Sequence, residues 1–228
     1  MTAESSPQEM ARLALVRPLF DRDVGLALVN PLADPPAPFA AETACLSPNA
    51  VDKRRREFAA GRAAAHQAMA QLGHAPVAIP VAKNRAPLWP SALVGSITHT
   101  RSCAMAVVAA KSAVQGLGID VEEDKPLADE LWPAICSAQE QDWLRQQDNP
   151  GQLAKLMFSA KEAAYKCQFT VSERYYGFDG MELTINLQEC RFSARFCADQ
   201  PPFTCGDHIS GRFAIGAGLI VTTAELRS

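Results

Sequence analysis

The chain has 228 residues, of which 48% are hydrophobic and 21% are charged, and its formal net charge is −3 at pH 7. This length allows one large domain or two compact halves, and the composition is ordinary for a globular protein. The slightly negative net charge argues against nucleic-acid binding driven by overall charge, so any anion-binding site must be local.

The first elements in chain order are a strand and a long helix. The opening residues MTAESSPQEM have neither a basic region nor a long apolar core, so we expect no signal peptide. Residues 24–30 (VGLALVN) are apolar and are followed by prolines, which predicts a strand and then a loop. The alanine-rich stretch from 51 to about 72 predicts a helix, and the proline-rich stretch 74–90 predicts an extended loop.

The second part of the chain repeats this order. Residues 91–111 contain two β-rich runs around the polar turn THTRS and predict a hairpin, and GLGIDVEE (116–123) predicts a further strand. Helices broken at Pro133 should follow, and then a longer helix from 152 to about 169. The last quarter alternates apolar and polar residues, which is typical of antiparallel strands.

The order strand, helix, hairpin therefore occurs twice. We predict an α+β fold of two pseudo-symmetric halves, residues 1–115 and 116–228, each a small antiparallel sheet packed on a long helix. No apolar run is long enough to span a membrane. The seven cysteines are odd in number and form no CxxC pair, which argues against a zinc ribbon and a disulfide framework. We therefore expect scattered reduced thiols in a cytoplasmic protein.

Three acidic residues are the first candidates for a functional site. Asp120 and Glu122 lie two apart in a predicted strand, so both side chains point to the same face. Two such carboxylates repel each other unless a cation lies between them, although a solvated sheet edge is the more common explanation. Glu162, on the predicted helix, would be a third carboxylate. Three oxygen ligands without histidine or cysteine suit Mg²⁺ or Mn²⁺, which would imply a substrate that carries phosphate.

The role of Lys166 depends on that site. It follows Glu162 by four residues and so lies one helical turn further on the same face. Such a pair is commonly a surface ion pair worth only about 0.2–0.5 kcal/mol. In the alternative, Glu162 binds the metal and Lys166 binds a phosphate oxygen.

A basic stretch at the start of the first long helix is the second candidate. Arg55 and Arg62 lie seven residues apart on one face, with Lys53, Arg54 and Arg56 around the same end. A solvated basic face explains this equally well, but the planar fork of arginine suits phosphate. Helix register decides which of the three consecutive arginines faces a ligand, and the sequence leaves that choice open.

Other residues support a phosphate site and exclude alternatives. Thr98 and His99 end a predicted strand and can present a hydroxyl and an imidazole to phosphate, although a lone histidine is more often structural. Gly61 is costly inside a helix and suggests that another group approaches closely. The chain has no P-loop, no GxSxG elbow and no GxGxxG fingerprint, which excludes a Walker nucleotidase and a serine hydrolase.

Five motifs occur along the chain in an order known from one protein family: RRREFAAGR, RAPLWP, GSITHT, GLGIDVE and FSAKEAAYK. Over about residues 50–170 they resemble the large, two-halved class of 4′-phosphopantetheinyl transferases, most closely the enterobactin-type branch. Those enzymes act on carrier proteins of siderophore, nonribosomal-peptide and polyketide biosynthesis. The resemblance implies a monomer with its active site in the cleft between the halves. It further implies transfer of the phosphopantetheinyl arm of coenzyme A to a serine of an apo carrier protein, with release of 3′,5′-ADP.

The resemblance also implies roles for single residues. Asp120, Glu122 and Glu162 would hold Mg²⁺, with Mn²⁺ possible, and Glu162 would be the general base. Lys166 would bind the pyrophosphate and assist the leaving group. The remaining coenzyme A contacts in the first half would be Arg55, Arg62, Arg85, Pro87, Thr98 and His99. The second half would hold the metal and dock the carrier, with Leu131, Trp132, Ile135 and Trp143 as candidate contacts unless they are ordinary core residues.

Two other functions compete with this one. A degenerate homologue would bind coenzyme A or a carrier protein without chemistry, but pure binding does not need three converging acids. An interaction protein would carry the acidic and lysine motifs as surface charge, and the three acids would then lie on different faces.

Overall fold

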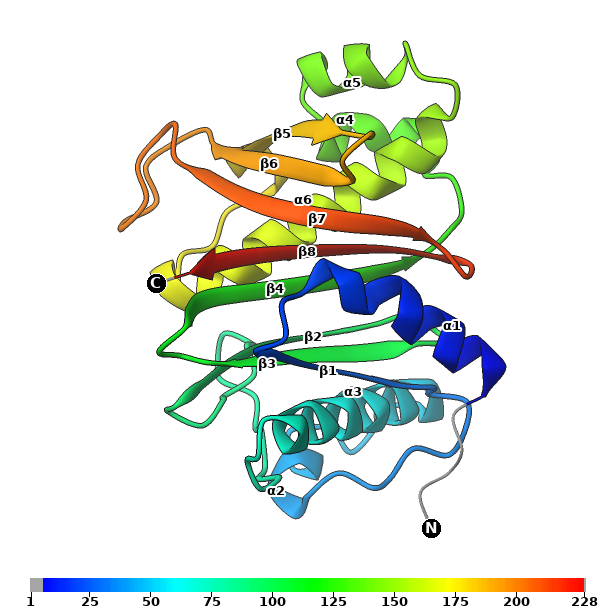
Figure 1. Ribbon diagram of the computed structural model, residues 1–228, viewed down its shortest axis with the longest axis vertical. Coiled ribbons are helices and arrows are strands. Elements are labelled where there is room, and N and C mark those ends of the chain that lie inside the picture. The colour runs from blue at the N-terminus through cyan, green and yellow to red at the C-terminus, as the bar shows by residue number, and fades with distance from the viewer. Residues whose placement is uncertain (1–5, 228) are drawn as a thin grey trace. The chain divides into compact units, whose positions relative to one another are not determined.

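The computed structural model describes residues 6–227. The chain divides into two compact units, of which the first ends at Val114 and the second runs from Gln115 to Arg227. Each unit has a β-sheet packed on a long helix, so the predicted two-halved α+β architecture is confirmed (Figure 1). Across residues 6–227, no helix is both long and apolar enough to cross a membrane.

The first unit is built around one long helix. Its elements are α1 (Pro7–Val16), η1 (Arg17–Leu19), β1 (Val24–Val29), α2 (Ala40–Thr43), α3 (Asp52–Gln71), β2 (Leu93–His99) and β3 (Ala104–Ala110). The strands form an antiparallel sheet in the order β1-β3-β2, and α3 lies along it (Figure 1). Alanines of α3, such as Ala64 and Ala68, pack with Leu93 and Val108 of the sheet in one apolar core. The predicted strand, long helix and hairpin are therefore confirmed.

The helix α1 was not among the predicted elements. Its first turn is stabilised by a capping box, in which the Ser6 hydroxyl accepts from the Glu9 backbone and the Glu9 carboxylate accepts from the Ser6 backbone. Pro7 occupies the first turn, where its missing N–H costs no hydrogen bond. The pattern Ser-Pro-x-Glu is the sequence signal from which this helix start was predictable.

The second unit has a larger sheet. Its elements are β4 (Val114–Glu123), η2 (Asp129–Leu131), α4 (Trp132–Ile135), α5 (Ala138–Leu144), α6 (Pro150–Ser172), η3 (Phe178–Gly180), β5 (Met181–Asn186), β6 (Arg191–Phe196), β7 (His208–Gly216) and β8 (Leu219–Arg227). The strand order is β4-β8-β7-β6-β5, with antiparallel pairs from β5 to β8. Buried residues of α6 such as Leu156 and Ala160 share a core with Phe196 and Ile220 of this sheet.

The predicted helix break at Pro133 is wrong. Pro133 lies in the first turn of α4, where a proline is tolerated because that N–H has no helical partner. The chain leaves the helix at Cys136, and Ser137 then caps α5 through its hydroxyl, which accepts from the Glu140 backbone at 3.2 Å. The serine three residues before a glutamate was the stronger signal here.

The two sheets share one internal order. In the first unit the order β1-β3-β2 places the last strand between the other two, and β4-β8-β7 does the same in the second. A glycine in each opening strand lets the long helix approach. A Cβ on Gly25 would lie 2.2 Å from the Ala68 carbonyl oxygen of α3, and one on Gly118 would lie 1.9 Å from the Ala163 carbonyl oxygen of α6. Strands β5 and β6 extend only the second sheet.

We expect Gly118→Ala to destabilise the second unit strongly, because a Cβ at this position collides with helix backbone that cannot move alone. The loss should reach or exceed the ~1–3 kcal/mol typical of overpacked cores, and thermal unfolding measures it. Gly61→Ala is the matched control, since its Cβ would meet only the Ile97 side chain at 3.0 Å and alanine favours the helix. Equal melting temperatures for Gly118→Ala and wild type would contradict the close approach.

Candidate active site

Four predicted site residues come together where β4 passes α6 in the second unit. Asp120 is buried and Glu122 is half-buried, and Ile119 and Val121, which alternate with them along the strand, are fully buried. Asp120 and Glu122 both accept hydrogen bonds from lysines of α6, so the two acids lie on the same face of the strand. On the same face as the two acids, Gly118 admits α6, which is why side chains of that helix reach them.

Two lysines of α6 bind the two acids of the strand. The Lys166 ammonium donates to Asp120 Oδ1 at 2.6 Å and to the Ile119 carbonyl oxygen at 3.2 Å. Lys155 donates to Glu122 Oε2 at 3.2 Å. Lys166 thus reaches across to the strand, which is more than the simple surface pair with Glu162 would require.

Lys155 was not predicted as part of this site. It precedes Glu162 by seven residues and Lys166 by eleven, so the three side chains lie on one helical face. This spacing was the only feature of the sequence that could have identified Lys155 as a site residue. It is weak evidence by itself, because a lysine in a helix usually faces solvent.

The carboxylates influence one another through the low-dielectric surroundings. Burial raises the pKa of Glu122, the charge of Asp120 raises it further, and Lys155 and Lys166 oppose the rise. Burial also raises the pKa of Glu162, with Lys166 opposing and with Asp120 and Glu122 adding to it. The three acids are therefore close enough to repel one another, which argues against three acids on separate faces.

The donor chemistry of this cluster fits a hard cation. All three candidate ligands are carboxylates, and a cation would relieve the mutual repulsion that adds to the effect of burial on the pKa of Glu122 and Glu162. No group of three histidine, cysteine, aspartate or glutamate side chains within residues 6–227 is already arranged to hold a metal ion. Lysines instead pair with Asp120 and Glu122.

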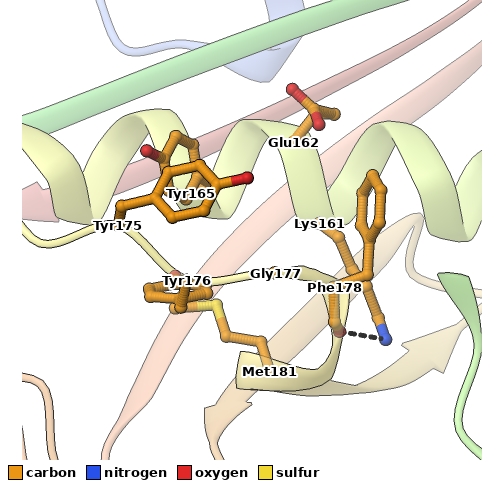
Figure 2. Close-up of a pocket in the computed structure, with 8 residues that line it drawn as sticks. All are labelled: Lys161, Glu162, Tyr165, Tyr175, Tyr176, Gly177, Phe178 and Met181. Atoms are coloured by element: carbon orange, nitrogen blue, oxygen red, sulfur yellow. Dashed lines mark hydrogen bonds between the residues drawn. The ribbon is translucent and has the colours of Figure 1, made fainter. Parts of the chain in front are cut away.

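A pocket with aromatic walls adjoins Glu162. Its volume is about 140 Å³, and Figure 2 shows it beside α6. Its lining residues are Lys161, Glu162, Tyr165, Tyr175, Tyr176, Gly177, Phe178 and Met181. The Tyr176 hydroxyl is buried and, within the described residues, has no hydrogen-bond partner. The pocket therefore offers apolar and aromatic surface next to a carboxylate.

In the first unit, the register of α3 brings Arg54 to His99. Arg54 Nη1 lies 3.2 Å from His99 Nε2, and Glu57 Oε2 lies 3.7 Å from His99 Nδ1. The neighbouring Thr98 is buried in β2. An arginine, an imidazole and a carboxylate therefore meet at the end of β2.

Arg55 and Arg62, the two arginines of α3 predicted to contact coenzyme A, have different surroundings. Arg55 donates to the backbone carbonyls of Ala50 at 2.8 Å and Pro48 at 2.6 Å, which fixes the chain before the helix. Arg62 is only 6% exposed, stacks over the Phe58 ring at 4.6 Å and lies 3.9 Å from the Glu42 carboxylate. Burial lowers the pKa of Arg62, and the charge of Glu42 opposes this.

The remaining predicted residues vary in exposure. Arg85 is exposed with a φ of 71°, at a turn where Val81 and Pro87 form a β-bridge. Gly61 has its close neighbour in Ile97, so packing within the unit accounts for that glycine. Among the candidate carrier contacts, Trp132 and Ile135 are buried core residues, Trp143 packs against the same core, and Leu131 is 48% exposed.

Comparison with known proteins places both units in one family. Residues 41–109 match the 4′-phosphopantetheinyl transferase N-terminal domain, and residues 116–217 match the 4′-phosphopantetheinyl transferase superfamily. The chain is 32% identical to 4′-phosphopantetheinyl transferase PptT of Mycobacterium tuberculosis, over 88% of this chain and 92% of that protein.

Two further relatives match over a shorter span. Identity is 37% to 4′-phosphopantetheinyl transferase Npt of Nocardia iowensis, over 61% of this chain and 63% of that protein. It is 39% to enterobactin synthase component D of Salmonella typhi, over 58% of this chain and 55% of that protein. The matched region thus spans somewhat over half the length of these two relatives.

Proposed function

Because the chain belongs to the 4′-phosphopantetheinyl transferase superfamily and is an enzyme of that class, we propose that it modifies an apo carrier protein with the arm of coenzyme A. The carrier serine oxygen forms a bond to the phosphorus that bears pantetheine. The bond from that phosphorus to the bridging oxygen breaks, and 3′,5′-ADP leaves. The observation that carries this proposal is the cluster of Asp120, Glu122 and Glu162 with two lysines beside an aromatic pocket.

Asp120, Glu122 and Glu162 would hold Mg²⁺, or Mn²⁺ in its place. Their oxygen-only donor set and mutual repulsion support this assignment. When bound, the cation would neutralise charge on the pyrophosphate. Lys155 and Lys166 already balance two of these carboxylates, and both ammonium groups can turn to phosphate oxygens when a substrate arrives.

Glu162 is proposed as the general base for the carrier serine. Its raised pKa makes it a better proton acceptor than an ordinary surface carboxylate, because base strength rises with pKa. It also lines the pocket, next to the space where the reacting groups would meet. Lys166 would stabilise the charge that develops on the leaving 3′,5′-ADP.

The aromatic pocket suits the pantetheine arm. That arm is a flexible chain with two amides, and the tyrosine rings provide apolar surface along it. The cavity adjoins Glu162, so a bound arm would lie near the base.

Residues of the first unit would bind the nucleotide part of coenzyme A. We propose Arg62, Thr98 and His99 for its phosphates, and Arg85 and Pro87 for the adenine side, as the motifs imply. Arg54 is added because α3 places it 3.2 Å from His99. Arg55 remains a candidate, although its guanidinium donates to Ala50 and Pro48.

The partner would be a carrier protein of siderophore, nonribosomal-peptide or polyketide biosynthesis. The relative named enterobactin synthase component D supports the siderophore branch. Leu131 is the exposed member of the candidate docking residues and is therefore the one retained. A monomer is proposed on the strength of the two-halved architecture.

The test is the intact mass of an apo carrier protein incubated with this protein, coenzyme A and Mg²⁺, with EDTA as the control. We expect a gain of one phosphopantetheinyl group that requires the metal. No gain with peptidyl, aryl and acyl carriers, while coenzyme A still binds, would instead favour a binding module without chemistry.

A further inference from the structure

One member of a buried ion pair, Lys161, lines the aromatic pocket. Lys161 and Glu140 have side chains that are 3% and 1% exposed, and the Lys161 ammonium lies 2.8 Å from Glu140 Oε2. Lys161 precedes the proposed base Glu162 in the chain and leaves α6 in a different direction (Figure 2). A buried pair of charges is costly, so its position relative to the pocket needs an explanation.

The lysine has no hydrogen left for a substrate. Its three N–H groups are matched by three acceptors, namely Glu140, the Ile135 carbonyl oxygen at 2.8 Å and the Phe178 carbonyl oxygen at 3.0 Å. This distinguishes Lys161 from Lys166, which is partly exposed at 27%. Lys161 therefore holds protein segments together and is not a phosphate ligand.

The glutamate connects further segments. Its Oε2 atom accepts from the Ser137 backbone at 2.7 Å, at the start of α5, and its Oε1 atom accepts from the Leu183 backbone at 2.7 Å, in β5. Together the pair links α6 to both ends of the segment 178–183. Figure 2 shows the hydrogen bond from the Lys161 ammonium to the carbonyl oxygen of Phe178, a residue that lines the pocket.

The segment held in this way forms the far wall of the pocket. Residues 175–178 and Met181 face the α6 residues Glu162 and Tyr165 across the cavity. The rings of Tyr165 and Tyr176 meet edge to face at 5.4 Å between centroids, which is a side-chain contact between wall and helix. The hydrogen bond from Lys161 to Phe178 ties the wall backbone directly to the helix that carries the base.

We propose that the Lys161–Glu140 pair is a positioning device that sets the width of the pocket and thereby the affinity for the pantetheine arm. This inference rests on the proposed function, because it takes the arm as the occupant of the pocket. It predicts that the pair governs binding of the arm and leaves binding of the nucleotide unchanged. A merely structural pair would weaken both equally, through a smaller folded fraction.

The test compares coenzyme A with 3′,5′-ADP, which lacks the arm, by calorimetric titration under the same metal concentration. Lys161→Met should weaken coenzyme A binding by about tenfold. The affinity for 3′,5′-ADP should stay within about twofold of the wild-type value, because only the pantetheine arm would contact the pocket wall. Glu140→Gln, which keeps the shape of the side chain, should shift the same ratio in the same direction. If Lys161→Met does not fold, the Glu140→Gln variant alone provides the test.

Two further variants separate positioning from stability. Ser159 lies on α6 like Lys161 but does not line the pocket, and its hydroxyl contacts that of Thr222 in β8 at 2.9 Å. Ser159→Ala should therefore lower the melting temperature without changing the ratio of affinities. The double variant Glu140→Gln/Lys161→Met should regain stability over Lys161→Met, because no unpaired carboxylate stays buried. Its coenzyme A affinity should stay low, because the bond to Phe178 is still missing.

The outcomes are distinct. An unchanged ratio of coenzyme A to 3′,5′-ADP affinity in folded Lys161→Met or Glu140→Gln overturns the positioning role, even if wild type transfers the arm normally. Equal affinity of wild type for the two ligands overturns the placement of the arm in this pocket. Failure of the proposed transferase function is seen separately, as an apo carrier that wild type does not modify.

Discussion

Glu162→Gln should abolish transfer of the phosphopantetheinyl arm while the protein becomes more stable at neutral pH. The substitution removes the proposed base, which alone is worth about 10²–10⁴-fold in rate, together with one charge of the acidic cluster. Measurement of turnover by intact carrier mass should therefore show a loss at the upper end of that range or beyond. Near-normal turnover would contradict the role assigned to Glu162.

The gain in stability follows from the direction of the pKa shift. Burial raises the pKa of Glu162, and Asp120 and Glu122 add to the rise against Lys166. Between the ordinary and the raised pKa, the folded protein binds more protons than the unfolded chain, so stability falls as the pH rises through this window. Above it, the ionised carboxylate destabilises the fold, and glutamine relieves that cost.

Thermal unfolding as a function of pH tests this sign. The melting temperature of Glu162→Gln should exceed that of wild type at neutral pH, and the difference should shrink as the pH is lowered toward the ordinary carboxyl pKa. Glu189→Gln, at an exposed turn between β5 and β6, is the control and should change neither turnover nor stability. A lower melting temperature for Glu162→Gln would show that its charge is favourably paired in the fold.

Lys166→Ala should lower both turnover and stability. Its ammonium lies 2.6 Å from Asp120 Oδ1, and that carboxylate is buried, so alanine removes the counter-charge of a buried acid. We expect a loss of about 1–3 kcal/mol, below the ~3–5 kcal/mol of a fully buried pair because the Lys166 side chain is 27% exposed. The rate should fall by about 10²-fold or more, because charge on the leaving group loses its partner.

A second substitution separates these two effects. Adding Asp120→Asn to Lys166→Ala removes the uncompensated charge and should recover stability, but it should not recover turnover because Asp120 is itself a proposed metal ligand. Arg145→Ala breaks an exposed pair with Asp142 at 2.9 Å and should affect neither property measurably. If Lys166→Ala transferred the arm at the wild-type rate, the ion pair between Lys166 and Asp120 would have only a structural role.

The long elements were predictable because their patterns are strong and local. The helix α3 begins and ends within one residue of its expected limits, and the hairpin β2–β3 forms around the predicted polar turn. The short helices α1, α4 and α5 depend on a few capping atoms, which is why one was missed and a break was misplaced. Period and composition say little about elements of so few turns.

The candidate site was predictable to the level of residue types. Strand alternation correctly placed Asp120 and Glu122 on one face, and helical spacing placed Lys166 one turn from Glu162. The partner of Lys166 was not predictable, because Asp120 is 46 positions away and the pairing depends on how β4 crosses α6. Lys161 was not among the candidate residues for the same reason, since a lysine in an alanine-rich helix looks exposed until its partner Glu140 is located.

The ion pairs Lys166–Asp120 and Lys155–Glu122 have a thermodynamic consequence. Three carboxylates face two ammonium groups, so one net negative charge is left to attract a divalent cation. A cation that enters alone must displace lysines that then have no anion to bind, whereas the pyrophosphate of coenzyme A accepts them. Metal and coenzyme A should therefore bind cooperatively, each raising the affinity for the other by the same factor.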